Sequence, residues 1–335
     1  MLLGNKWTML LCMVTAWIPI SQAQDSSTGL AGKVICLDPG HGGTADSDQY
    51  RVGIGGEREE WINLRVGLYL RELLEDAGAT VLMTRKEDVA IPLQDRAQLA
   101  VDHAADLFLS IHHNATADTA VNFPVIYFHG HVTENKASIA LAKHMAKALV
   151  DGLYRDRQSE TPVGIMSDHT IFPQAGTAVL RHSYGIPALI VEASFFTNPA
   201  EEQRLKHEAY NRREALAYLR AIKCFFEQPV DTIYPKNSLV APLQPFAVLQ
   251  EADRMSEMAL AWRDNYREAK RIFHDKDTAR YEEACALLLQ SVIAFPDSHL
   301  AGDCLDLYAA LLRRMGMEVE ADEMQRRRHE HYLEN

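Results

Sequence analysis

Three apolar runs, far apart in the sequence, each lead into a residue that can bind a metal ion or work beside one. The runs lie in the segments VICLDPGHGG (34–43), DLFLSIHHNA (106–115) and IPALIVEASFFTN (186–198), and the polar residues are His41, His112 and Glu192. Runs of this length and composition predict buried strands. The polar groups would then lie at the carboxyl ends of those strands, the edge where open parallel sheets build their sites.

A further carboxylate, Glu59, opens the amphipathic stretch after the first run. With His41 and His112 it gives two histidines and a glutamate, and Glu192 is a spare carboxylate, a set that suits a hydrolytic zinc site. Each residue has an ordinary alternative, because turn histidines are common on surfaces and acidic residues favour the first turn of a helix. Neighbours in an extended segment point to opposite faces, so either His112 or His113 should reach a shared site, and spacing does not choose.

The other histidines lack a comparable placement in the sequence. We interpret most of them as surface residues, among them His129, His131 and His169. His182 lies close enough in sequence to Glu192 to line a substrate groove.

The amino terminus has the pattern of a secretory signal peptide. Lys6 precedes an apolar stretch from Trp7 to Ile20, and small residues lead to Ala23. We therefore expect residues 1–23 to be cleaved, giving an exported protein, periplasmic or extracellular, with no membrane span. An uncleaved anchor is the alternative, but the apolar stretch is short for the about 20 residues that a span needs.

Charge and cysteine content narrow the possible partners and crosslinks. The net charge of −12 argues against nucleic acid as a partner. Cys36 lies inside the first expected strand and fits a small core residue. Cys285 and Cys304 flank a turn at Pro296, so an exported protein could join them in a disulfide, although the distance between them cannot be read from sequence.

Strand and helix patterns alternate along the first two thirds of the chain. The expected strands are 34–37, 80–84, 107–111, 125–128 and 188–191, and the expected helices are 59–77, 93–104, 134–153 and 208–227. This alternation predicts an α/β fold with a mostly parallel sheet flanked by helices. Prolines mark 229–245 as a linker.

The region 246–335 is expected to be a small all-helical domain. Residues 281–316 predict two helices around a Pro-Asp-Ser turn, with tyrosine, alanines and proline placed as in a tetratricopeptide-like hairpin. An ordinary helical bundle is the alternative. The region could dock a protein partner, localise the protein or pack on the first domain.

The ordered motifs VICLDPGHGG, GEREEWINL, VLMTRKEDVAIPLQDRAQLA, ADLFLSIHHNA and PALIVEASFFTN resemble the zinc-dependent N-acetylmuramoyl-L-alanine amidases of type 3 over about residues 34–226. The resemblance implies a six-stranded sheet in a catalytic domain at 30–228. It also implies one Zn²⁺ ion held by His41, Glu59 and His112, with Glu192 as the catalytic carboxylate. Asp38 is expected to orient a ligand histidine without binding the ion itself.

The reaction implied is hydrolysis of the amide between the lactyl group of N-acetylmuramic acid and L-alanine in peptidoglycan. An exported zinc peptidase acting on peptidoglycan peptides, or a non-catalytic wall-binding adaptor, are alternatives. The chain departs from the family pattern at Glu60 and Val101, neither of which is an expected ligand. Residues 152–177 match no pattern and lie where substrate-contacting loops are expected.

Overall fold

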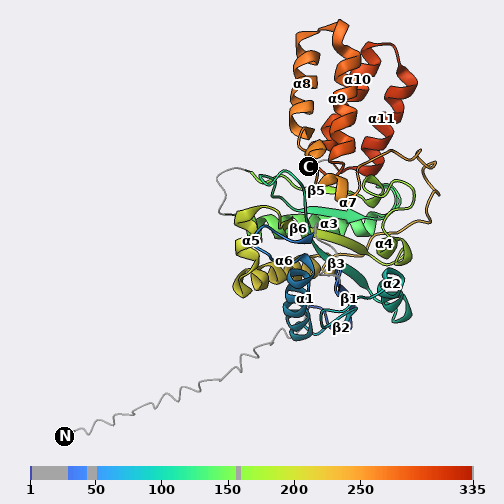
Figure 1. Ribbon diagram of the computed structural model, residues 1–335. Coiled ribbons are helices and arrows are strands. Elements are labelled where there is room, and N and C mark those ends of the chain that lie inside the picture. The colour runs from blue at the N-terminus through green and yellow to red at the C-terminus, as the bar shows by residue number, and fades with distance from the viewer. Residues whose placement is uncertain (2–28, 44–50, 156–159, 334–335) are drawn as a thin grey trace.

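The computed structural model describes Met1 and residues 29–43, 51–155 and 160–333 (Figure 1). The predicted signal peptide, apart from Met1, lies outside the described residues. Within the described part of the chain, no helix is both long enough and apolar enough to cross a membrane.

A six-stranded sheet forms the centre of the molecule, in the order β2-β1-β3-β6-β4-β5. Its strands are β1 (Val34–Pro39), β2 (Thr80–Met83), β3 (Leu107–Asn114), β4 (Val125–Phe128), β5 (Gly164–Ser167) and β6 (Ala188–Phe195). The first three and β6 run parallel, whereas β4 is antiparallel to β6 and β5 is parallel to β4. The predicted mostly parallel sheet is confirmed, with β5 as the strand that the sequence pattern missed.

Side chains alternate between the two faces of the sheet, and each face has its own apolar core. On β1, Ile35 and Leu37 join one core and Cys36 the other. The first face is covered by α1 (Glu59–Asp76), α3 (Lys136–Leu149) and α6 (Glu208–Phe226). The second face is covered partly by α2 (Leu93–Asp102) and α4 (Ala178–His182).

Helix α1 shows how the sequence determines one of these layers. Ile62, Val66, Leu70 and Leu74 are buried at intervals of one helical turn, which forms the stripe that packs on the sheet. The helix ends before Gly78, whose φ of 91° is the left-handed conformation that glycine adopts easily. Glu59 is therefore the first residue of a helix anchored on the sheet.

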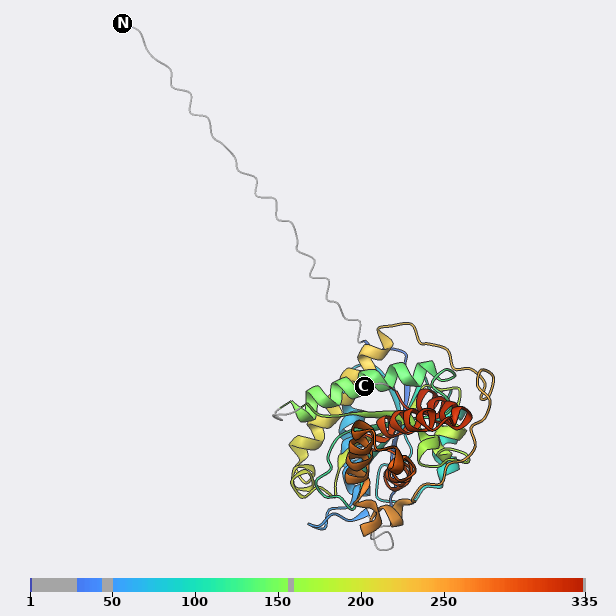
Figure 2. The ribbon, with the colours of Figure 1, turned by 90° about the horizontal axis from the view of Figure 1, so that it is seen from above.

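The carboxyl-terminal region is helical and packs directly on the second face (Figures 1 and 2). It contains α7 (Glu251–Arg254), α8 (Trp262–Asp275), α9 (Tyr281–Ala294), α10 (Ala301–Arg314) and α11 (Glu318–His331). Phe123 and Phe195 of the α/β part contact Phe295, and Trp262 contacts Phe295 from the other side. The helices therefore share one continuous apolar core with the sheet.

The end of the chain returns to the sheet. Tyr332 forms an antiparallel bridge with Met166, and the Leu333 N–H donates to the Ile165 carbonyl at 2.9 Å. These contacts cover the outer edge of β5, which would otherwise expose unpaired backbone groups. Cys285 and Cys304 are both free thiols, so they form no disulfide in this structure.

Candidate metal and catalytic site

His41 lies in a tight turn immediately after β1. Its φ of 58° is unusual for a residue with a side chain, a conformation that clusters at functional sites. A Cβ atom on Gly40 would overlap the imidazole ring of His112, so only glycine allows the turn to approach β3 this closely. The backbone thus places the His41 ring beside that of His112.

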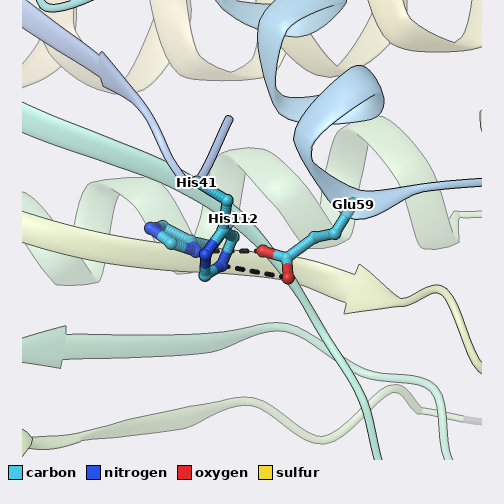
Figure 3. A group of neighbouring side chains, drawn as sticks. All are labelled: His41, Glu59 and His112. Atoms are coloured by element: carbon cyan, nitrogen blue, oxygen red, sulfur yellow. Dashed lines mark hydrogen bonds and ion pairs between the residues drawn. The ribbon is translucent and has the colours of Figure 1, made fainter. Parts of the chain in front are cut away.

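The side chains of His41, Glu59 and His112 point toward one another from three different elements (Figure 3). His41 Nε2 lies 3.1 Å from Glu59 Oε2, and His112 Nδ1 lies 3.0 Å from Glu59 Oε1. The two histidine ring centroids are 4.6 Å apart. Nitrogen or oxygen atoms from all three lie within 4.8 Å of one another, a spacing that a single metal ion could bridge.

The two adjacent histidines of β3 separate as an extended strand requires. His112 faces the cluster, whereas His113 is 1% exposed on the other face. There, His113 Nδ1 lies 2.9 Å from Asn63 Oδ1, and its Nε2 lies 3.1 Å from Glu214 Oε2. The His113 side chain therefore joins α1 and α6 to the sheet, and the contact of His113 with the cluster is its backbone N–H, which donates to Glu59 Oε1 at 3.3 Å.

Electrostatics favour the protonation states that metal ligands need. Burial alone would raise the pKa of Glu59, but His41 and the hydrogen bond with His112 hold it well below its usual range. Burial lowers the pKa of His112, although the hydrogen bond with Glu59 opposes this shift. At neutral pH the carboxylate is thus charged and the His112 ring is neutral, as a ligand histidine must be.

Two buried arginines hold the backbone of the His41 turn. Arg96 donates to the carbonyl oxygens of His41 at 2.6 Å and Pro39 at 3.0 Å. Arg85 donates to the carbonyl oxygens of Pro39 at 2.8 Å and Gly40 at 2.9 Å. The turn is therefore fixed through its carbonyl groups, which leaves the His41 ring available to the cluster.

The expectation that Asp38 orients a ligand histidine is wrong. Its carboxylate accepts hydrogen bonds from Arg96 at 2.8 Å, Thr84 at 2.7 Å and Ser110 at 2.7 Å. Burial alone would raise the pKa of Asp38, but Arg96 and the two hydroxyl groups lower it. Asp38 acts on the site indirectly, because it fixes the arginine that holds the backbone of the turn.

Asn63 supports the glutamate of the cluster. Its amide nitrogen donates to Glu59 Oε1 at 3.1 Å, and its amide oxygen is the group that faces His113. Asn63 follows Glu59 by four residues, so the two share a helix face. That spacing is the sequence signal by which this residue could have been found.

An open cleft of about 620 Å³ lies over the cluster, and Glu192 lines it together with the three residues. Glu192 pairs with His112 across β3 and β6, and neighbouring strands lie about 4.8 Å apart. The fourth predicted residue therefore belongs to the same site. A substrate that enters the cleft would meet Glu192 and the cluster together.

One wall of the cleft comes from the helical region, which sequence reasoning did not anticipate. Arg254 lines the cleft and forms a buried ion pair of 2.6 Å with Asp297, in the turn between α9 and α10. Asp297 also accepts a hydrogen bond from Asn114 at 3.0 Å, and Tyr127 at 2.5 Å. Burial would lower the pKa of Arg254, but Asp297, Tyr127 and Glu192 raise it, which places its charge close to Glu192.

The remaining sequence predictions for the site concern three histidines and the segment 152–177. His182 is exposed and is not among the described residues that line the cleft, so the expected role in a substrate groove is wrong. His129 and His131 are 2% and 7% exposed, so they are not the surface residues that were expected. From the unmatched segment 152–177, Ile171 and Phe172 line the cleft, as expected for substrate-contacting loops.

Comparison with known proteins identifies the α/β part. The sequence model of the N-acetylmuramoyl-L-alanine amidase family matches residues 35–224. Amidase AmiA of Salmonella typhimurium is 28% identical over 240 residues, which cover 62% of this chain and 80% of that protein. Amidase AmiC of Escherichia coli is 31% identical over 241 residues, which cover 59% of this chain and 55% of that protein.

Solved structures give the same result. Amidase AmiC2 of Nostoc punctiforme superimposes with a TM-score of 0.50 at 26% identity, covering 59% of this chain and 99% of that one. The CwlD amidase of Clostridioides difficile, solved in complex with the GerS lipoprotein, has a TM-score of 0.50 at 25% identity over 58% of this chain and 98% of that one. Both matches have about the length of the α/β part.

The fold and the relatives place the protein in the class of enzymes that hydrolyse amides of the cell wall. The chain belongs to the N-acetylmuramoyl-L-alanine amidase family.

Proposed function

We propose that the protein hydrolyses the amide between the lactyl group of N-acetylmuramic acid and L-alanine in peptidoglycan, with one zinc ion and a glutamate base. The observation that carries this proposal is the convergence of His41, Glu59 and His112 within 4.8 Å beneath a cleft that Glu192 also lines. Membership of the amidase family supports the choice of substrate.

The donor set fits zinc. Two imidazoles and one carboxylate are a known ligand set of catalytic zinc sites, which keep a further position for water or substrate. The His41 and His112 side chains are each 15% exposed, so the cluster is open toward the cleft. Bound there, zinc would supply Lewis-acid chemistry, activating water for attack and polarising the scissile carbonyl.

Glu192 is proposed as the general base. Its carboxylate would accept a proton from the attacking water and return that proton to the leaving nitrogen of L-alanine. Arg254 lies near enough to interact with Glu192 electrostatically, so a positive charge adjoins the proposed base. The buried Asp297 fixes that arginine in place.

The cleft has the size and lining for a sugar-peptide junction. Its volume of about 620 Å³ falls within the range typical of ligand sites. Ile171 and Phe172 provide apolar contact surface, and Arg51 and Arg181 provide positive charge. Stem peptides carry carboxylates, so these arginines are suitable partners for the peptide side of the substrate.

Zinc content and peptidoglycan cleavage in the wild type and in Glu192→Gln test the proposal together. We expect both proteins to hold zinc at the cluster and only the wild type to release peptides from the glycan. Glu72→Gln, at an exposed glutamate of α1, is the matched control and should behave as the wild type. Full activity in Glu192→Gln would exclude Glu192 as the base.

The products decide between this activity and an exported zinc peptidase. An amidase leaves glycan chains whose muramic acid carries no peptide, whereas a peptidase leaves shortened peptides still attached to muramic acid. Mass spectrometry of the digested wall distinguishes the two. Shortened peptides on muramic acid would overturn the amidase assignment while leaving the zinc site intact.

Export and a protein partner are further parts of the proposal. Residues 1–23 are proposed to act as a cleaved signal peptide, which amino-terminal sequencing of the exported protein tests. The helical region is proposed as a docking surface, since Met258, Leu260 and Val319 are exposed apolar residues on it. The relative CwlD was solved with a lipoprotein partner, which gives a precedent for partner binding in the family.

A further inference from the structure

A second group of histidines surrounds a buried carboxylate, and its members are not among the described residues that line the cleft. Strands β4 and β5 run parallel to each other, and Phe128 pairs with Ser167 at their ends. His129 follows the first strand directly, and Asp168 and His169 follow the second. Because β4 is antiparallel to β6, these ends lie at the opposite edge of the sheet from His41 and His112.

The three side chains meet as closely as those of the first cluster. Nitrogen or oxygen atoms of His129, Asp168 and His169 lie within 4.8 Å of one another. His129 Nδ1 lies 3.0 Å and 2.9 Å from the two carboxylate oxygens of Asp168. The ring centroids of His129 and His169 are 5.2 Å apart, a spacing that two ligands of one ion can have.

Neighbouring groups fix the orientation of these side chains. Asp168 accepts hydrogen bonds from the Thr177 N–H at 2.7 Å and the Thr177 hydroxyl at 2.8 Å. The two Thr177 donors therefore hold the Asp168 carboxylate beside the histidine rings.

Two more imidazoles extend the group. The ring of His331, at the end of α11, lies 6.0 Å from that of His169 and 5.4 Å from that of His131. The buried Nδ1 of His131 has no hydrogen-bond partner among the described residues.

Two buried carboxylates adjoin the group. Asp168 and Glu134 are both 0% exposed, and one oxygen of Glu134 has no hydrogen-bond partner among the described residues. The cations that face the group are Lys236, whose Nζ lies 3.2 Å from His129 Nε2, and the side chains of Arg181, Arg326 and Arg327. Burial makes an unpartnered carboxylate oxygen costly, and a bound cation would offset that cost.

We propose that His129, Asp168 and His169 bind a second divalent transition-metal ion, of the zinc class, with His331 and His131 as the nearest further donors. Imidazole and carboxylate donors together suit zinc and its neighbours rather than calcium or magnesium. Asp168 and His129 are buried and are not among the described residues that line the cleft, although their neighbours Gly176 and Thr177 are, so substrate has no direct access to them. Closed sites of this kind stabilise structure.

At this location the proposed ion would connect the helical region to the sheet. The end of α11 is tied to the same loop, because the Val132 N–H donates to the Glu330 carbonyl at 3.0 Å and the Thr133 hydroxyl donates to the Glu330 carboxylate at 2.8 Å. An ion between β4 and β5 beside His331 would fasten the helical region to the sheet. The site would therefore act on stability and leave the chemistry of the cleft unchanged.

Zinc stoichiometry of the full-length protein tests the proposal. After dialysis against metal-free buffer, elemental analysis should give two zinc ions per chain in the wild type, one in Glu59→Ala, one in His169→Ala and none in the double variant. His182→Ala, at an exposed histidine outside both clusters, is the matched control and should hold two. Zinc should also raise the Tm of Glu59→Ala and leave that of the double variant unchanged.

Two outcomes would overturn the second site. One is a Glu59→Ala protein that binds no zinc, which remains decisive even if His169→Ala fails to fold. The other is a folded double variant that keeps the ion held by Glu59→Ala. In that case Asp168 and the histidines are a hydrogen-bonded packing group only.

Discussion

Two clusters in which histidine rings surround a buried carboxylate lie at opposite edges of one sheet. Their inner geometry is alike, since in each the donor atoms lie within 4.8 Å of one another. They differ in what covers them. His41 and His112 face a cleft of about 620 Å³ with Glu192, whereas His129 and Asp168 are buried near the end of α11.

This difference shows that ligand chemistry alone does not make a catalytic site. Hydrolysis needs an open position beside the metal and a base within reach of it, whereas a structural ion needs neither. The first cluster faces the cleft that Glu192, the proposed base, also lines. The second has additional imidazoles where the first has a cleft, which is why we assign it to stability.

The largest expected difference between the clusters is in activity. His112→Ala should reduce peptidoglycan hydrolysis to the background level, because it removes a donor of the open cluster. His169→Ala should leave the hydrolysis rate of the folded protein unchanged. Dye release from labelled peptidoglycan measures both, and loss of activity in His169→Ala would contradict the assignment of the two roles.

The second prediction concerns Glu192, the proposed base beside the cluster of His41, Glu59 and His112. Glu192→Gln keeps the shape of the side chain and removes its basicity, so activity should fall about 10²- to 10⁴-fold. Zinc content should not change, because Glu192 is not one of the proposed ligands. A fall in zinc content would instead mean that Glu192 is a ligand.

A third prediction concerns Arg254, the residue of the helical region that forms one wall of the cleft. Asp297→Ala leaves the Arg254 charge buried without its partner, which should lower the free energy of unfolding by about 3–5 kcal/mol. Asp322→Ala, which removes an exposed ion pair on α11, is the control and should cost less than about 1 kcal/mol. Urea titrations followed by circular dichroism measure both. Equal effects would mean that the Asp297 network does not hold the wall.

The smallest expected effect is that of changing Asp38, next to the His41 turn, and it depends on pH. The pKa of Asp38 is lowered in the folded protein, so its stabilisation is present above the unfolded value of about 3.9 and is lost as pH falls through the folded value. Asp38→Asn should therefore cost about 2 kcal/mol at pH 7, and the difference from the wild type should shrink in acid. A difference that stays constant with pH would exclude a role of the Asp38 charge.

The sequence predicted the strands that carry the open cluster, because long apolar runs ending in His41, His112 and Glu192 have few other interpretations. Strand β5 was missed, since GIMS is short and contains glycine and serine. The residues of the second cluster could not be grouped from sequence, because the reversed direction of β4 is a property of the assembled sheet. The interpretation that His129 lacks a comparable placement was wrong, because it directly follows the apolar run 125–128.

Sequence patterns also do not predict contacts between side chains that are far apart in the chain. Asp38 precedes His41 by three residues, yet its carboxylate turns to Arg96, which follows it by 58 positions along the chain. The Arg254 and Asp297 pair comes from a region whose packing on the sheet has no periodic signal. Nothing in the local pattern around Arg254 indicates that it lines the cleft.

The shared core of the sheet and the helical region has a consequence for biosynthesis. A ribosome or export channel releases the α/β part before the helices, so Phe123 and Phe195 stay uncovered until Trp262 and Phe295 have emerged. The cleft lacks its Arg254 wall over the same interval. A chain cut short in this region would therefore expose these aromatic side chains and lack the Arg254 side of its cleft.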